Sequence, residues 1–84
     1  MALLDFLTST GRRRRRWRRE EKTWIQQNSF PPIVVRDYVH EAHLKRDRRH
    51  LRRLGYRLKF TTLDKYPPHH WYATYERDDQ PGSG

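Results

Sequence analysis

The chain has 84 residues, of which 35% are charged and 33% hydrophobic, so it has room for one small domain at most. It carries 19 Lys and Arg against 10 Asp and Glu, a net charge of +9. It has no cysteine, which excludes a disulfide framework and a thiolate metal site. A positive excess of this size favours a polyanionic partner, nucleic acid first and an anionic membrane surface second.

Several features of the sequence indicate a cytoplasmic protein. No apolar run approaches the roughly 20 residues that a bilayer span needs. The opening residues, MALLDFLTST, lack the basic start of a secretory signal. The absence of cysteine also suits an intracellular protein.

The first predicted element is an arm, residues 1–19, which joins a short apolar stretch to an arginine run. Because like charges repel, we expect it to be flexible and to contact a phosphate backbone or enter a minor groove. The arginines concerned are Arg12, Arg13, Arg14, Arg15, Arg16, Arg18 and Arg19. An apolar turn followed by basic residues is also typical of a membrane anchor, so membrane contact through residues 1–19 is the rival interpretation.

From residue 20 the sequence indicates a domain that ends at residue 77. A helix-like segment comes first and stops at NSFPP, since proline cannot continue a helix. Between residues 33 and 54 the apolar side chains do not share one helical face, which predicts a helix over 34–42, a turn, and a second helix from 45 or 46 to 54. A single unbroken helix over the whole stretch is the alternative.

Gly55 is placed as the cap just past the end of that second helix. The segments YRLKFTT and WYATYER then alternate at period two and predict a β-hairpin, with Tyr56, Leu58 and Phe60 on one face of the first strand. We expect Trp71 and Tyr75 to be core residues. Residues 78–84, DDQPGSG, are typical of a disordered tail.

In this order of elements, and in the string RRHLRRLGYRL followed by HWYATYER, the chain resembles the winged helix-turn-helix family of DNA-binding domains over about residues 20–77. The resemblance implies an α+β fold, a small winged-helix domain of about three helices followed by a two-stranded antiparallel hairpin. It also implies that the last helix enters the major groove and that the loop over 63–70 is the wing.

Basic side chains on the last predicted helix lie at spacings of three and four residues. Arg46, Arg49 and Arg53 would form a stripe suited to phosphates or guanine edges, because the guanidinium fork binds either in bidentate fashion. Supporting nucleic-acid contacts are expected from Lys45, Arg52, Arg57 and Lys65. Leu51 and Leu54 would face the core.

A metal centre or a catalytic site is not indicated. HEAH, His40 to His43, places its histidines three apart rather than the four of the zincin motif. No nucleophile–base pair or glycine-rich phosphate loop is present, so we expect neither cofactor nor catalysis.

The sequence therefore predicts a nucleic-acid-binding protein acting on duplex DNA, as a transcription regulator or accessory factor in a DNA transaction. It would bind as a homodimer or within a larger assembly. The alternatives are a basic structural protein associated with RNA or a ribonucleoprotein, and a peripheral membrane adaptor.

Overall fold

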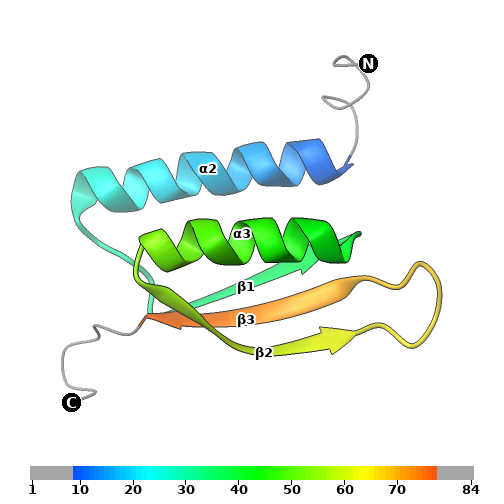
Figure 1. Ribbon diagram of the computed structural model, residues 1–84. Coiled ribbons are helices and arrows are strands. Elements are labelled where there is room, and N and C mark those ends of the chain that lie inside the picture. Colours follow the sequence, from blue (N-terminus) through cyan, green and yellow to red (C-terminus); the bar gives the residue numbers. More distant parts are fainter. Residues whose placement is uncertain (1–8, 78–84) are drawn as a thin grey trace. The chain divides into compact units, whose positions relative to one another are not determined.

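The computed structural model describes residues 9–77, so the apolar start of the arm, residues 1–8, and the predicted tail, residues 78–84, lie outside the described residues. The described part contains α2 (Ser9–Gln27), β1 (Ile33–Tyr38), α3 (Glu41–Arg53), β2 (Tyr56–Leu63) and β3 (Trp71–Arg77) (Figure 1). The mixed α+β class is confirmed. The prediction of three helices and two strands is wrong, because the described residues form two helices and three strands.

The chain divides into two units, the first ending at Phe30 and the second beginning at Pro31. The first contains α2. The second contains the other helix and all three strands of the described residues.

Residues 12–19, expected as a flexible arm, belong instead to α2. Arginine has a high helix propensity, so a run of arginines is not by itself a helix breaker. Ion pairs one turn apart offset part of the repulsion, at 3.8 Å between Arg16 Nε and Glu20 Oε1 and at 2.8 Å between Arg18 Nη1 and Glu21 Oε2. The helix ends before Asn28, whose φ of 50° is typical of a left-handed cap.

Residues 34–38, predicted as the first part of a helix over 34–42, lie instead in strand β1. Val34, Arg36 and Tyr38 are buried, whereas Ile33 and Val35 are exposed, so the segment has the period of two that a strand requires. This alternation was not recognised in the sequence because Arg36 occupies one of the buried positions, and a charged residue ordinarily marks an exposed one. The alternative of one unbroken helix over residues 33–54 is wrong for the same reason.

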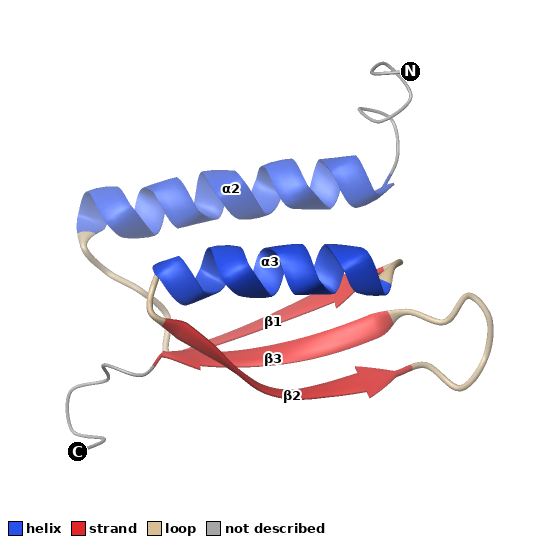
Figure 2. Cartoon of the chain, viewed as in Figure 1, coloured by secondary structure: helices blue, strands red, loops and turns tan. Residues whose placement is uncertain are grey.

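The three strands form one antiparallel sheet in the order β1-β3-β2 (Figure 2). The predicted hairpin of β2 and β3 is confirmed, and β1 pairs with the other side of β3, with Val35 opposite Thr74. Because both outer strands run antiparallel to β3, they are parallel to each other. Helix α3 makes the crossover between them and contacts all three strands on one face of the sheet.

A β-bulge at Lys59 reverses the faces of β2 halfway along the strand. Leu58 lies opposite Tyr75 and Phe60 lies opposite Thr74, so one residue of β2 has no counterpart on β3. Beyond the bulge, Phe60 therefore points away from α3 and is 56% exposed. The prediction that it shares a face with Tyr56 and Leu58 is wrong.

The core of the second unit lies between α3 and the sheet. Leu51 and Tyr75 are completely buried, and Tyr56, Leu44 and Ala73 are buried with them. The expected core position of Tyr75 is thus confirmed, whereas Trp71 is only half-buried. Fully burying one side chain such as Leu51 contributes about 1.5–3 kcal/mol of hydrophobic stabilisation, so these few residues carry much of the fold's stability.

The predicted glycine cap is confirmed at the end of α3. Gly55 has a φ of +95°, which other residues rarely adopt, and its N–H donates to the Arg52 carbonyl at 3.1 Å. The helix begins at Glu41, four or five residues before the predicted start at 45 or 46. The cap turns the chain directly into β2.

Candidate nucleic-acid interface

The inner face of α3 carries an acidic residue, Asp47, which is buried between the helix and β1. Its Oδ2 accepts a hydrogen bond from Arg36 Nη1 at 2.9 Å and another from the Tyr38 hydroxyl at 2.5 Å. The Arg36 and Asp47 side chains are 1% and 5% exposed, which makes this a buried ion pair. A hydrogen bond of 2.9 Å joins the Tyr38 and Tyr75 hydroxyls and extends the network to β3. The network therefore ties α3 to two strands.

The same network raises the pKa of both tyrosines. Burial is the main cause for Tyr38, and the negative charge of Asp47 adds to it, because an ionised phenol would lie beside a carboxylate. Burial also raises the pKa of Tyr75, opposed in part by the hydrogen bond with Tyr38. Both phenols therefore stay protonated at neutral pH and can serve as donors.

Since Asp47 turns inward, the outer face of α3 is almost entirely basic. Glu41 is the acidic side chain on the exposed side of this helix, and its Oε1 lies 3.2 Å from Lys45 Nζ. Except for that lysine, the basic side chains of the outer face form no ion pair with another described residue. The six exposed basic residues are Lys45, Arg46, Arg48, Arg49, Arg52 and Arg53.

Four of these residues line one hollow of about 410 Å³, namely Lys45, Arg48, Arg49 and Arg52. Their spacing of three and four residues along the helix keeps them on one side. This cluster, the α3 basic face, is centred differently from the predicted stripe, since Arg46 and Arg53 do not line the hollow. Arg48 was not among the predicted contacts, although its spacing of three from Lys45 and four from Arg52 indicates the same helix face.

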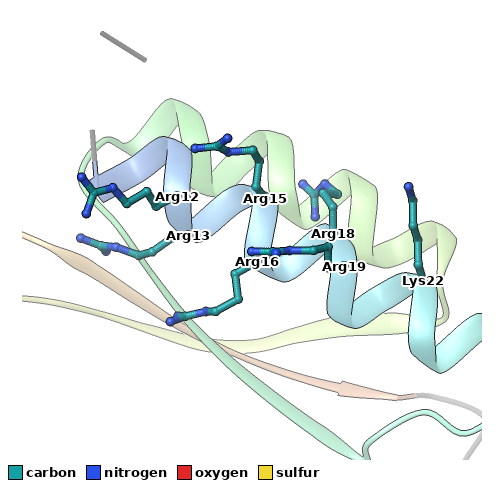
Figure 3. A pocket seen from close by; sticks show the side chains of 7 residues that line it. All are labelled: Arg12, Arg13, Arg15, Arg16, Arg18, Arg19 and Lys22. Carbon is teal, nitrogen blue, oxygen red and sulfur yellow. The ribbon is translucent and has the colours of Figure 1, made fainter. Parts of the chain in front are cut away.

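Helix α2 carries a second basic surface. A hollow of about 640 Å³ runs along it, and Figure 3 shows the side chains that line it projecting from the helix. The predicted residue Arg14 is exposed but does not line this hollow. Lys22, which the sequence analysis did not include, does. The lining residues are Arg12, Arg13, Arg15, Arg16, Arg18, Arg19 and Lys22.

The remaining predicted contacts lie away from the α3 basic face. Arg57 follows the glycine cap and lies near the start of β2, opposite Glu76. Lys65 lies beyond the other end of β2, in the loop that leads to β3. The structure thus gathers most of the predicted residues along the two helices, with Arg14, Arg46 and Arg53 outside the hollows, and places Arg57 and Lys65 on the hairpin.

The histidines of the HEAH motif pack against each other at the start of α3. The His40 and His43 rings meet edge to face at a centroid distance of 5.2 Å. Among residues 9–77, no group of three His, Cys, Asp or Glu side chains is arranged to hold a metal ion. Neither helix of that stretch is long and apolar enough to cross a membrane.

Comparison with models of protein families, with curated protein sequences and with solved structures finds no match for the chain.

Proposed function

We propose that this protein binds nucleic acid, with duplex DNA as the preferred ligand, through the α3 basic face. The observation that carries the proposal is the inward orientation of Asp47, the one acidic residue in the run from His43 to Leu58. With that carboxylate held by Arg36, the guanidinium groups on the outer side of the helix have no neutralising partner on α3, and the Lys45 ammonium is the basic group there that is paired, with Glu41.

The chemistry of this face suits a phosphate backbone. An α-helix fits the major groove of B-form DNA, where arginine side chains can reach both phosphates and guanine edges. The planar guanidinium fork bonds either group in bidentate fashion. Contacts to phosphate release counterions, so binding of this kind weakens steeply as salt is added.

A packed sheet behind the helix supports the interaction. The inner face of α3 is fixed by Leu44, Leu51 and the Asp47 network, so the helix does not have to fold when it binds. Preorganisation lowers the entropic cost of association. The basic surface of α2 would add phosphate contacts of the same kind.

One part of the winged-helix interpretation agrees with the structure, namely a basic helix that leads through Gly55 into a hairpin. The helix-turn-helix pair does not, because β1 occupies residues expected to form the first helix of that pair. We therefore propose binding dominated by the phosphate backbone, with no catalytic role, as suits an accessory factor in a DNA transaction.

The test compares ligands for the unmodified chain and for the triple variant R48Q/R49Q/R52Q. Fluorescence polarisation is measured with a blunt DNA duplex, an RNA duplex of the same sequence and vesicles of anionic phospholipid. We expect the DNA duplex to bind best, because the A-form major groove of RNA is too narrow for a helix. The glutamine variant should lose about tenfold or more in duplex affinity, at about 1.4 kcal/mol per tenfold.

The matched control is R48K/R49K/R52K, which keeps the charge and removes the guanidinium fork. It should retain most of the duplex affinity if phosphate contact dominates. Thermal unfolding confirms that each variant folds. Equal duplex affinity of the glutamine variant and the unmodified chain would refute the proposal, and so would tighter binding to vesicles than to any nucleic acid.

A further inference from the structure

The sheet face opposite α3, here called the open face, carries large exposed side chains. Val35, Phe60 and Tyr72 are 64%, 56% and 39% exposed. Thr74 of β3 lies opposite Phe60 of β2 on one side and opposite Val35 of β1 on the other. Val35, Thr74 and Phe60 therefore form one row across the sheet. A contiguous exposed apolar patch, unlike single exposed side chains, is typical of an interaction or ligand-binding site.

Phe60 and Tyr72 occupy diagonal positions on two neighbouring strands of this face. Tyr72 is two residues from Thr74 on β3, which makes it the diagonal neighbour of Phe60 across the strand pair. Side chains in that relation are about 7 Å apart and within reach of each other. The bulge at Lys59 is the feature that places Phe60 beside Tyr72 rather than in the core.

At the Tyr72 end of the open face, the loop between β2 and β3 forms a hollow of about 380 Å³. Lys65, Tyr66, His70 and Tyr72 line it together with Asp64, Pro67 and Pro68. Hydrogen bonds hold the loop in shape, from Asp64 N–H to the His70 carbonyl at 2.9 Å and from the Tyr72 hydroxyl to Asp64 Oδ2 at 3.3 Å. Tyr66 is 74% exposed, with Lys65 Nζ 6.0 Å from its ring centroid.

The hairpin that carries these rings has a small positive excess, whereas Asp37 of β1 lies opposite Tyr72 and 3.6 Å from His70 Nδ1. The hairpin from Tyr56 to Arg77 contains four Lys and Arg against two Asp and Glu, a net charge of +2. Both acidic groups are engaged, Asp64 with Tyr72 and Glu76 with Lys59 Nζ at 3.0 Å. The exposed cations on the hairpin are Arg57, Lys59 and Lys65.

From this arrangement we propose that the open face binds single-stranded nucleic acid, with bases stacked on Phe60 and Tyr72 and a further base in the loop hollow beside Tyr66. Aromatic rings on an open sheet stack bases of any sequence, and cations beside them hold the backbone. The inference rests on the proposed function, because it assigns a second class of nucleic acid to the same protein. The site is separate from the α3 basic face, since the helix covers the other side of the sheet.

The charge and the aromatic rings distinguish this ligand from a second copy of the chain. An interface between two copies would use Ile33 and Val35 as much as Phe60, because burial of any of them removes apolar area from water. Base stacking requires the rings alone. Substitutions of the two kinds of residue therefore give different results.

The test measures polarisation of a labelled single-stranded oligonucleotide and, separately, of a blunt duplex. We expect Phe60→Ala and Tyr72→Ala each to weaken single-strand binding by about 5- to 140-fold, from roughly 1–3 kcal/mol per stacked base, and to change duplex affinity less than about twofold. Phe60→Tyr, which keeps a ring, and Val35→Ala, which removes aliphatic area from the same row, should bind the single strand as the unmodified chain does.

Two further measurements distinguish base stacking from phosphate contact and from dimer formation. The salt dependence of single-strand binding should be the same for Phe60→Ala and the unmodified chain, because no phosphate contact is lost. Sedimentation should show the same oligomeric state for Val35→Ala and the unmodified chain. The proposal is overturned if the alanine variants bind the single strand normally, if Phe60→Tyr weakens it as much as Phe60→Ala, or if Val35→Ala dissociates a dimer. If duplex binding persists while single-strand binding is absent, this inference alone is overturned; if both are absent, the proposed function is refuted as well.

Discussion

At the scale of single residues, the orientation of Asp47 decides the character of α3. Taking a carboxylate and a guanidinium out of water costs several kcal/mol, which their attraction offsets only when the geometry is good. Here Arg36 and Tyr38 both donate to the carboxylate, and Tyr38 is in turn hydrogen-bonded to Tyr75. The cluster fixes the rotation of the helix, so the outward direction of its arginines follows from this inner contact.

Replacing Asp47 with asparagine should therefore destabilise the fold strongly. The variant leaves the Arg36 charge buried without its counter-charge, and breaking such a pair costs about 3–5 kcal/mol in the free energy of unfolding. Urea denaturation measures this loss. The control is Glu41→Gln, which removes an exposed pair with Lys45 and should change stability by less than about 1 kcal/mol. Similar midpoints for Asp47→Asn and Glu41→Gln would contradict the role given to the cluster.

The two buried tyrosines should make the fold sensitive to alkali. The unfolded chain loses phenolic protons near pH 10, whereas the raised pKa of Tyr38 and Tyr75 keeps them protonated in the folded state. The unfolded state then binds fewer protons than the folded state, so stability falls as pH rises above 10 and is unaffected by this pair below it.

Phenolate absorbance and circular dichroism, followed together during an alkaline titration, check this expectation. The last phenolates should appear only as the circular dichroism of the folded state is lost. A Tyr38→Phe/Tyr75→Phe variant should lose less of its neutral-pH stability above pH 10. Complete phenolate formation in a chain that stays folded would contradict it.

Arg36 also shows where residue-level prediction from the sequence ends. The alternation Val34, Arg36, Tyr38 is visible only once the arginine is known to be buried, and its partner Asp47 lies 11 residues away along the chain. Nothing local to either residue marks the pair. The burial of Leu51, by contrast, follows from helical spacing alone, and the structure confirms it.

At the scale of elements, the junction between α3 and β2 is well specified by the sequence. A glycine that follows a helix with basic residues in its last turn is a strong stop signal, and the structure gives Gly55 the positive φ that such a cap requires. The strand that follows begins one residue later, at Tyr56. The whole hairpin takes its position relative to the helix from this turn.

Substituting Gly55 with alanine should lower stability by about 1–2 kcal/mol, the cost of a left-handed conformation for a residue with a side chain. The added Cβ would lie 3.4 Å from Arg77 Nη2, at the flexible end of that side chain, so backbone strain rather than a clash causes the loss. Gly55→Asn should lose less, because asparagine tolerates this conformation better. Midpoints of urea denaturation give the comparison, and an alanine variant as stable as the original chain would show that the cap is not strained.

Strand faces were predicted less well than the junction. Period two correctly identified β3, with Ala73 and Tyr75 inward, but the bulge in β2 has no glycine or proline to mark it. One extra residue is enough to move Phe60 from the predicted inner face to the open face. The position of Phe60 in the candidate single-strand site therefore could not be predicted from the sequence.

At the scale of the whole molecule, the main feature is a net charge of +9, which is evident from the sequence. In the structure, much of the basic charge lies on two helices. The sequence predicted that the arginines act on an acidic partner, and the structure exposes most of them along the two helices, whereas Arg36 is buried. The sequence did not predict that residues 12–19 are helical. Charge repulsion within the arginine run opposes a helix, whereas ion pairs with Glu20 and Glu21 favour one.

The salt dependence of duplex binding tests the role of the α3 basic face most directly. Each phosphate contact contributes about 0.9 to the slope of log K against log salt, so R48Q/R49Q/R52Q should have a slope smaller by about 2–3 than the unmodified chain. The lysine variant of the same positions should keep the original slope. A slope unchanged by the glutamine substitutions, in a variant that folds normally, would contradict the assignment of this face to the nucleic-acid backbone.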